Sequence, residues 1–467
     1  MRFMYRMKQL ILISGDALCY IAGLWIAVTL RYFTPASGET IQIILPHFLG
    51  LFFLWVTVNY INGLYDMERL NNSFRFYRRH FEAGVLSILI GIIFFYLFSP
   101  ATITPKTILI LNVLAGYNLS AVWRFVYNKY LGKKTLQTRV LFVGYTPEVK
   151  ELVTFMSAMP EKGYLPMAII DPENLYKSTN NGDNESTISI YRTLKTIRPA
   201  ITNHKINLVV IAPHLRQDAE ALRELYELLF WSVRITNLPS LYEIITGRIS
   251  PSTFSEGWFL DHLKNKEQPI YGNIRTLTDI IGAVFIGVIF LALFPFIALA
   301  IKTTTKGPLF LSQKRIGKDG KEFVLYKFRS MIALSSDGSA ETDGAIFASK
   351  NDVRITKVGK FLRKVRLDEL PQVLNIIKGD ISIIGPRPER PEIVSQLEAR
   401  MPYYSLRHIV KPGLTGWAAI HQHYTDTLET SLQKLQYDLY YIKNRSLLLD
   451  ASIILRSVNV VMRMMGQ

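Results

Sequence analysis

Long apolar stretches dominate the N-terminal part of the chain and are separated by short polar segments. They are Gln9–Leu30, Ile41–Leu64, Phe81–Ser99 and Ile108–Val126. Each has roughly the 20 residues that a helix needs to cross the hydrocarbon core of a bilayer. The pattern therefore predicts a transmembrane bundle of four helices within residues 1–135.

Basic residues alternate in number along the segments that flank these stretches. They are frequent before the first stretch, between the second and third, and after the fourth: Arg2, Arg6, Lys8, Arg69, Arg75, Arg78, Arg79, Lys129, Lys133, Lys134 and Arg139. Only Arg31 and Lys106 lie in the other two connections. The positive-inside rule then places both ends of the bundle in the cytoplasm. A buried core of a soluble protein is the alternative, and it would leave this alternation unexplained.

A fifth apolar stretch, Ile280–Ile301, is also long enough to cross a membrane. Basic residues lie on both sides of it, which places both of its ends on the cytoplasmic face. Pro295 removes a backbone donor from the stretch and clashes with the preceding turn, which kinks a helix. We therefore predict a re-entrant helix that enters and leaves on the same face, in preference to a spanning one.

The segment 136–265 alternates short apolar runs with amphipathic ones. The expected strands are Arg139–Gly144, Pro166–Asp171, Asn207–Ala212 and Val233–Thr236, and the expected helices are Pro147–Met159 and Ala219–Trp231. Alternating strands and helices indicate a doubly wound, Rossmann-like α/β domain. Only Gly144 follows the first strand, where a dinucleotide site requires three glycines. We therefore expect a domain that has lost nucleotide binding and has a structural or regulatory role.

Composition and charge support a membrane protein with an anionic partner. Hydrophobic residues make up 49% of the 467 residues, the mean hydropathy is +0.17 and the formal net charge is +17. Such a charge favours nucleic acid, anionic lipid or a phosphorylated substrate, and no nucleic-acid motif is present. The single cysteine, Cys19, excludes an intramolecular disulfide and a Cys-based metal site.

The segment 270–467 contains charged pairs at spacings that suit phosphate chemistry. Lys327 and Arg329 are two residues apart in an expected strand, so both side chains lie on one face and can grip a phosphate. Asp368 and Glu369 follow the cations Arg363 and Arg366 closely. A solvated strand face and an acidic helix N-terminus are the alternatives for these two patterns.

Two further motifs follow. The turn Pro386-Arg387-Pro388 fixes the backbone around one guanidinium, which suits a two-pronged grip on phosphate. A second run carries Arg407, His408 and Lys411 ahead of Pro412-Gly413.

Together, the ordered motifs KFRSM, LRKVRLDELPQ, KGDISIIGPRPE and RHIVKPGLTGW resemble the bacterial sugar transferase family. This resemblance is to its large members, in which four membrane spans and a Rossmann-like domain precede a mostly helical, monotopic catalytic domain with a re-entrant helix. It covers about Ile274 to the C-terminus. Arg275 and Asp279 stand where the family has a basic–acidic pair before that helix. Pro295 retains the proline of the family's bend, although Phe294 replaces the usual serine.

The resemblance implies a polyprenyl-phosphate phosphoglycosyl transferase. Asp368 would attack the β-phosphate of a UDP-sugar and release UMP, and undecaprenyl phosphate would then take the phospho-sugar from the aspartate. Glu369 would bind Mg²⁺, with Asp368, or assist proton transfer. The phosphate and nucleotide contacts would come from the following residues: Lys327, Arg329, Arg363, Arg366, Pro386, Arg387, Pro388, Arg407, His408 and Lys411.

The implied location is the bacterial inner membrane, with both soluble domains in the cytoplasm, and the implied pathway is exopolysaccharide, capsule or O-antigen synthesis. The middle domain is a candidate dimer contact. Three other functions were weighed. A Leloir-type glycosyltransferase of the GT-A fold usually carries an Asp-x-Asp motif, which is absent. A transporter would need a polar path, and no charge pair deep in the spans was expected. A non-catalytic scaffold would not need the Asp368-Glu369 pair.

Overall fold

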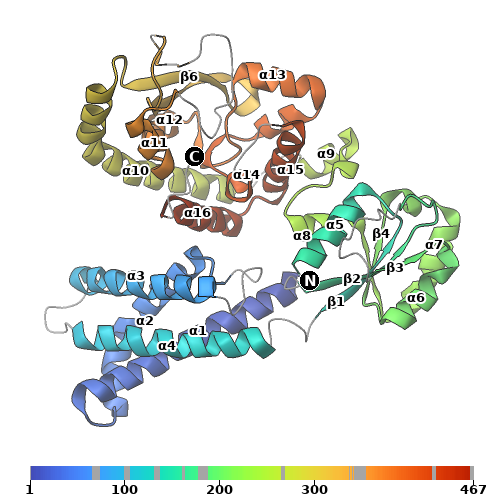
Figure 1. Cartoon of the computed structure of the whole chain (residues 1–467), viewed down its shortest axis with the longest axis horizontal. Coiled ribbons are helices and arrows are strands. Elements are labelled where there is room, and N and C mark those ends of the chain that lie inside the picture. The colour runs from blue at the N-terminus through green and yellow to red at the C-terminus, as the bar shows by residue number, and fades with distance from the viewer. Residues whose placement is uncertain are drawn as a thin grey trace. The chain divides into compact units, whose positions relative to one another are not determined.

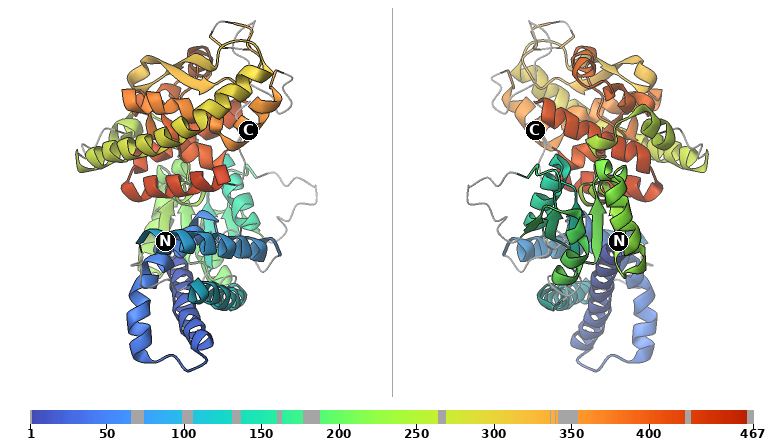
Figure 2. Two further views of the ribbon diagram at one scale, coloured as in Figure 1. Left: turned by 90° about the vertical axis from the view of Figure 1, so that its left-hand side faces the viewer. Right: turned by 90° about the vertical axis from the view of Figure 1, so that its right-hand side faces the viewer.

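The computed structural model describes residues 2–65, 74–98, 106–130, 137–159, 163–176, 188–263, 269–335, 337–338, 340, 354–422 and 427–462. The chain forms two compact units, Met1–Ile245 and Thr246–Gln467. Figures 1 and 2 show the helices and strands of both units.

Four long helices make up the N-terminal part of the first unit. They are α1 (Arg2–Tyr32), α2 (Gly38–Ile61), α3 (Phe74–Phe98) and α4 (Lys106–Tyr130). Each contains a segment long and apolar enough to cross a membrane, which agrees with the predicted stretches. Their inner sides share one core that includes Tyr20, Trp55 and Tyr117, whereas many large apolar side chains face outward. An apolar exterior of this kind suits lipid.

A charged pair lies inside this group of helices. Asp16 on α1 and Arg124 on α4 form an ion pair, and both side chains are 0% exposed. The carboxylate also accepts hydrogen bonds from Ser120 Oγ at 2.7 Å and from the Tyr65 hydroxyl at 2.8 Å. Arg124 donates in addition to the Leu64 carbonyl at 2.8 Å. The expectation that no charge pair lies within the spans is therefore wrong, because both residues lie inside candidate membrane segments.

The rest of the first unit is an α/β domain with a five-stranded parallel sheet in the order β3-β2-β1-β4-β5. Its elements are β1 (Thr138–Val143), α5 (Pro147–Ala158), β2 (Tyr164–Ile170), β3 (Ser189–Tyr191), α6 (Ile197–His204), β4 (Leu208–Ile211), α7 (Ala219–Glu227), β5 (Arg234–Asn237) and α8 (Leu238–Thr246). Each face of the sheet has its own buried cluster, which explains the continuous apolar runs of its strands. The predicted α/β fold is confirmed, with β3 as an additional strand.

The second unit is mostly helical. Its main elements are α9 (Glu256–Leu263), α10 (Pro269–Thr304), β6 (Phe310–Ile316), β7 (Glu322–Phe328), α11 (Lys357–Val365), the 3-10 turn η8 (Leu367–Gln372), α12 (Val373–Lys378), β8 (Ser382–Ile384), α13 (Pro391–Arg400), the 3-10 turn η9 (Tyr404–Ile409), β9 (Gly413–Thr415), α14 (Trp417–His421), α15 (Leu428–Asn444) and α16 (Leu447–Met462). β6 and β7 form an antiparallel hairpin, and β8 pairs with β9 in parallel. Helix α9 lies in this unit, whereas the middle domain predicted from the sequence extends to residue 265.

Helix α10 contains Tyr271–Thr304, which has the highest hydropathy of the five candidate spans found among the described residues. It continues through Pro295 as one helix. Along one side, Ala283 and Ile297 pack against α12 and α11, while apolar residues on the remaining surface are exposed. A re-entrant path for α10 stays a prediction.

Candidate active site

The two adjacent carboxylates lie on η8, the short turn between α11 and α12. Arg366 ends α11 in the left-handed conformation, with φ at 58°, and this reverses the chain direction. Pro371 then follows inside the turn, where a fixed φ helps to keep the geometry tight. As a result Asp368 and Glu369 are both held in a buried position, each 8% exposed.

Glu369 is surrounded by cations from three different parts of the unit. Its Oε1 lies 2.9 Å from Lys327 Nζ and 2.9 Å from Arg387 Nη2, and its Oε2 lies 3.6 Å from Arg366 Nη1. Burial by itself raises the pKa of this carboxyl group. The neighbouring charges of Lys327 and Arg387 outweigh that effect and hold the pKa of Glu369 well below its usual range. Glu369 is therefore ionised and fixed in place.

Asp368 has different surroundings from its neighbour. No hydrogen bond or ion pair to its carboxylate is found among the residues that the structure describes. Burial, followed by the charge of Glu369, raises the pKa of Asp368, and the charges of Lys327 and Arg363 oppose the rise. A carboxylate of raised basicity that is free of partners suits a nucleophile, whereas one held by three cations suits an anchor.

The hairpin strand β7 brings Lys327 to Glu369. Asn375 on α12 ties this strand to the turn, because its Nδ2 donates to the Val324 carbonyl at 2.7 Å and its Oδ1 accepts from the Tyr326 amide at 3.2 Å. Both amide ends of a buried asparagine are thus used to set the distance between β7 and η8.

Arg329 was expected beside Lys327, but the structure places it elsewhere. Strand β7 ends at Phe328, and the Arg329 guanidinium donates to the carbonyls of Thr305, at 3.0 Å, and Lys306. These carbonyls follow the last residue of α10, where they have no partner within the helix. Arg329 therefore fixes the end of α10 rather than facing the carboxylates.

Two other predicted phosphate contacts, Arg407 and Lys411, are likewise not paired with Asp368 or Glu369 in the described structure. Arg407 is buried against Asp438 and does not reach the carboxylates of η8, and no ion pair joins the exposed Lys411 to either carboxylate in the described structure. The Nε2 atom of His408 is buried without a partner among the described residues. Burial and the charge of Arg407 lower the pKa of His408 to about 4, so it is neutral at physiological pH.

Arg275 and Asp279, one turn apart on α10, both bind β8. Arg275 Nη2 donates to the Ile384 carbonyl at 2.5 Å, and Asp279 Oδ1 accepts from the Ile383 amide and Ser382 Oγ, each at 2.9 Å. This basic–acidic pair therefore joins the apolar helix to the strand that leads directly into Pro386-Arg387-Pro388.

Glu389, the residue after that turn, is a further carboxylate, with its side chain 13% exposed. It pairs with Lys434 on α15 and lies 3.7 Å from Arg315 Nη1. Burial raises its pKa, but the charges of Lys434, Arg407 and Arg315 dominate and lower the pKa of Glu389 from 4.5 to about 2. No local pattern in the sequence indicates a role for Glu389, Lys434 or Arg315.

The second unit should lose stability in acid because of Glu389. A carboxyl group whose pKa is depressed in the folded state stabilises the fold above its unfolded pKa and loses that contribution as the pH falls. The contribution should decline between pH 4.5 and about pH 2, and its full size is about 3 kcal/mol. The thermal midpoint of the Glu389→Gln variant should be lower than that of the wild type at neutral pH and should change less over this range. An equal acid dependence in both proteins would contradict this expectation.

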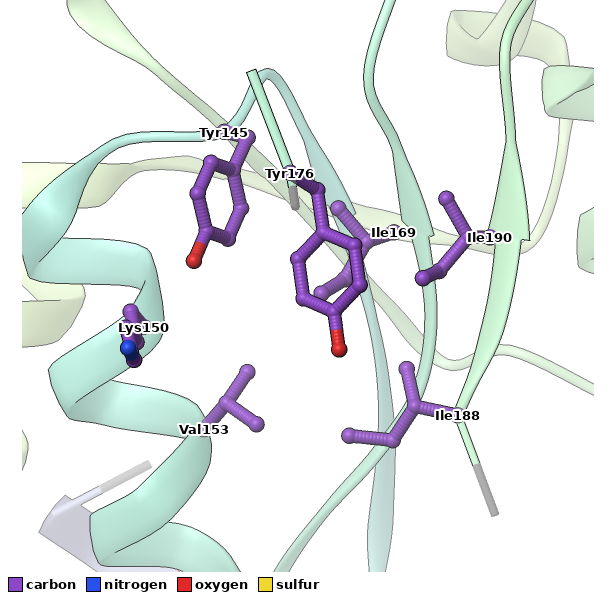
Figure 3. Close-up of a pocket in the computed structure, with 7 residues that line it drawn as sticks. All are labelled: Tyr145, Lys150, Val153, Ile169, Tyr176, Ile188 and Ile190. Carbon is purple, nitrogen blue, oxygen red and sulfur yellow. The ribbon is translucent and has the colours of Figure 1, made fainter. Parts of the chain in front are cut away.

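A small apolar pocket lies in the α/β domain, at the position where a dinucleotide would bind to such a fold. Tyr145 and Tyr176 enter it beside Ile169 and Ile188, and Figure 3 shows these side chains pointing into one narrow space between α5 and the sheet. The two tyrosine rings contact edge to face, with their centroids 5.2 Å apart. The free volume of the pocket is about 10 Å³, which leaves room for about one water molecule.

The carboxylate of Asp171, the residue after β2, already has partners within the chain. Asp171 accepts the amides of Leu175 and Tyr176 at 3.2 and 2.8 Å and pairs with Arg192 at 2.5 Å. In a dinucleotide site, a carboxylate at this position binds the ribose. The loss of nucleotide binding stays a prediction, and these contacts are its physical basis.

The family model described as "Bacterial sugar transferase" matches residues 270–464, and one described as "CoA-binding domain" matches residues 60–239. The chain is 32% identical over 389 residues to the UDP-glucose:undecaprenyl-phosphate glucose-1-phosphate transferase of Klebsiella pneumoniae, a match that covers 80% of this chain and 79% of that protein. The chain belongs to the bacterial sugar transferase family.

Two further relatives match over shorter stretches. The UDP-N-acetylgalactosamine-undecaprenyl-phosphate N-acetylgalactosaminephosphotransferase of Aeromonas hydrophila is 38% identical over 240 residues, 50% of this chain and 53% of that protein. The UDP-glucose:undecaprenyl-phosphate glucose-1-phosphate transferase of Escherichia coli (strain K12) is 35% identical over 259 residues, 54% of each chain. The chain thus spans only about half the length of these two relatives. With the Klebsiella protein, they confirm the predicted family and its enzyme class, phosphoglycosyl transferase.

Proposed function

We propose that this bacterial sugar transferase moves a sugar 1-phosphate from a UDP-sugar to undecaprenyl phosphate, and that Asp368 carries the phospho-sugar between them. The observation that carries the proposal is the contrast within one buried pair. Glu369 is held by three cations, whereas no hydrogen bond or ion pair to the Asp368 carboxylate is found among the described residues. The relatives named above act on UDP-sugars and undecaprenyl phosphate, which supports the same substrate classes for this chain.

In the first step, a carboxylate oxygen of Asp368 attacks the β-phosphorus of the donor. A bond forms between this oxygen and phosphorus, and the bond from phosphorus to the bridging oxygen breaks, so that UMP leaves with the electron pair. Arg387 and Lys327 lie next to the nucleophile and neutralise the phosphate oxygens as charge shifts to the leaving group. Arg363, whose charge acts on Asp368, adds to this field.

In the second step, an oxygen of undecaprenyl phosphate attacks the same phosphorus. The bond to Asp368 breaks, the carboxylate is restored and the diphosphate-linked sugar leaves on its lipid. The exposed apolar surface of α10 lies on the same unit as the carboxylates, which supports a membrane-bound acceptor. The sugar is unassigned, because the relatives are named for different ones.

The carboxylates of η8 are ligands of the kind that a magnesium ion prefers, although Glu369 already contacts three cations. Asp368 and Glu369 are the residues that would hold it, since Mg²⁺ prefers carboxylate oxygens and takes much of its shell from water and phosphate. No group of three or more possible ligands among His, Cys, Asp and Glu occurs in the described residues, in keeping with a site that substrate completes. When bound, the ion would neutralise charge on the phosphates.

The location and assembly are part of the same proposal. We place the chain in the bacterial inner membrane with both soluble domains in the cytoplasm, where UDP-sugars are made, and in a pathway that builds exopolysaccharide, capsule or O-antigen. A homodimer through the α/β domain is kept as a prediction.

The identity of the released nucleotide tests the reaction. The full chain in nanodiscs is incubated with undecaprenyl phosphate, Mg²⁺ and a panel of UDP-sugars. We expect UMP with at least one donor, because the β-phosphate stays with the sugar. Release of UDP would show direct glycosyl transfer, and no nucleotide from any donor would favour a scaffold.

A further inference from the structure

The backbone of the Pro386-Arg387-Pro388-Glu389 turn is fixed at every carbonyl. The four hydrogen bonds are, in chain order, Gly413 N to Pro386 O at 2.9 Å, Arg407 Nη2 to Arg387 O at 2.8 Å, Arg315 Nη1 to Pro388 O at 3.2 Å and Ile316 N to Glu389 O at 2.9 Å. Two prolines further limit the backbone, because each fixes its own φ. The backbone of this turn is therefore held more firmly than that of an ordinary surface loop.

Two of these four donors are guanidinium groups, and acidic partners hold both in place. Asp438 accepts from Arg407 Nε at 3.1 Å and lies 2.9 Å from its Nη2, and the two side chains are 2% and 1% exposed. The third nitrogen of Arg407 donates to the Tyr404 hydroxyl at 2.6 Å. Arg407 thus has one orientation, and that orientation brings it to the Arg387 carbonyl.

Glu389 holds the second guanidinium. It lies 3.7 Å from Arg315 and is paired on its other side with Lys434. Lys434 and Asp438 are one turn apart on α15 and both are buried. A single face of this helix therefore supplies both the partner of Glu389 and the partner of Arg407. Each charged side chain of this network has an oppositely charged partner, which offsets the cost of removing it from water.

Among the described residues, the Arg387 side chain makes no hydrogen bond or ion pair other than that with Glu369. It is 40% exposed and reaches Glu369 with one nitrogen. Its direction is therefore set by the backbone from which it projects. We infer that Asp438 and Lys434 on α15 are positioning residues, which act through Arg407 and Glu389 to aim the Arg387 guanidinium at the donor phosphate. This inference rests on the function proposed above.

A displacement of the guanidinium by about 1 Å is enough to lower the rate of a positioned phosphoryl transfer roughly 100-fold. Asp438→Asn removes the charge that orients Arg407 and should lower kcat for UMP release about 10- to 100-fold, with a smaller change in KM. Asp438→Glu keeps the charge and should restore much of the rate. Glu429→Gln changes an exposed carboxylate in the first turn of the same helix and should leave kcat unchanged.

A double-mutant cycle with Arg387→Ala separates positioning from folding. If Asp438 acts through Arg387, then Asp438→Asn should have little further effect once Arg387 is removed. A loss of the same size in both backgrounds would show that Asp438 only stabilises the unit, and would overturn the inference. If Asp438→Asn does not fold, Lys434→Gln is used in the same cycle, since it removes the charge that pairs with Glu389.

The two proposals fail in different ways. If the wild-type protein releases UMP but the losses caused by Asp438→Asn and Arg387→Ala are additive, only the positioning role is contradicted. Wild-type protein that releases no UMP from any UDP-sugar would overturn the proposed function and the inference with it.

Discussion

Replacement of Asp368 by asparagine is expected to lower UMP release by about four orders of magnitude or more. The amide has nearly the shape of the carboxylate but is a far weaker nucleophile, so the buried turn should keep its fold while the first bond cannot form. UMP release is measured from the full chain in nanodiscs. In the absence of acceptor, wild-type protein should also gain the mass of one sugar phosphate per chain, and the variant should not.

Asp319→Asn is the matched control for this substitution. Asp319 is an exposed aspartate in the left-handed conformation between β6 and β7, where asparagine is well tolerated. Its variant should turn over at the wild-type rate. Near-normal UMP release from Asp368→Asn would show that another group attacks the phosphate, and would exclude the proposed aspartyl intermediate.

The second large effect is expected within the membrane helices. Asp16→Leu should destabilise the folded helices by about 3–5 kcal/mol, because Arg124 is then buried without a counter-charge. The double variant Asp16→Leu with Arg124→Met should be less destabilised than the single one, since apolar residues of similar volume replace a buried pair at little cost. Unfolding of the purified protein in a denaturing detergent measures the difference.

Glu82→Gln provides the control for this pair. Glu82 is partnered by Arg78 one turn away on α3, and both side chains are largely exposed. Its loss should cost about 1 kcal/mol or less. If Asp16→Leu were no more harmful than Glu82→Gln, the buried pair would contribute nothing to the packing of α1 and α4.

Local signals in the sequence were sufficient for much of the fold. Apolar length located α1 to α4 and α10, and buried strand patterns located β1, β2, β4 and β5, because each depends only on neighbouring residues. Strand β3 was missed, since three half-buried residues leave no periodicity to detect. The motifs also identified Asp368, Glu369, Lys327 and Arg387, which the structure brings together.

The residues whose partners the sequence did not predict depend on distant contacts. Arg329 continues the two-residue period of a strand that has already ended, so its partner at the end of α10 could not be anticipated. Lys434 and Asp438 have the spacing of a solvated helix face, and only the packing of α15 shows that this face is buried. Asp16 and Arg124 are too far apart in sequence for any local pattern to join them.

The pairing of the first and last helices in the membrane has a consequence for synthesis of the chain. Asp16 enters the insertion machinery long before Arg124 has been made, and a lone aspartate in a membrane helix carries an insertion cost of about 2.5–3.5 kcal/mol. The first helix therefore gains its full stability in lipid only when the fourth emerges from the ribosome. Biogenesis of this enzyme is coupled from one end of its membrane domain to the other, and a nascent chain that stops before α4 should remain beside the translocon.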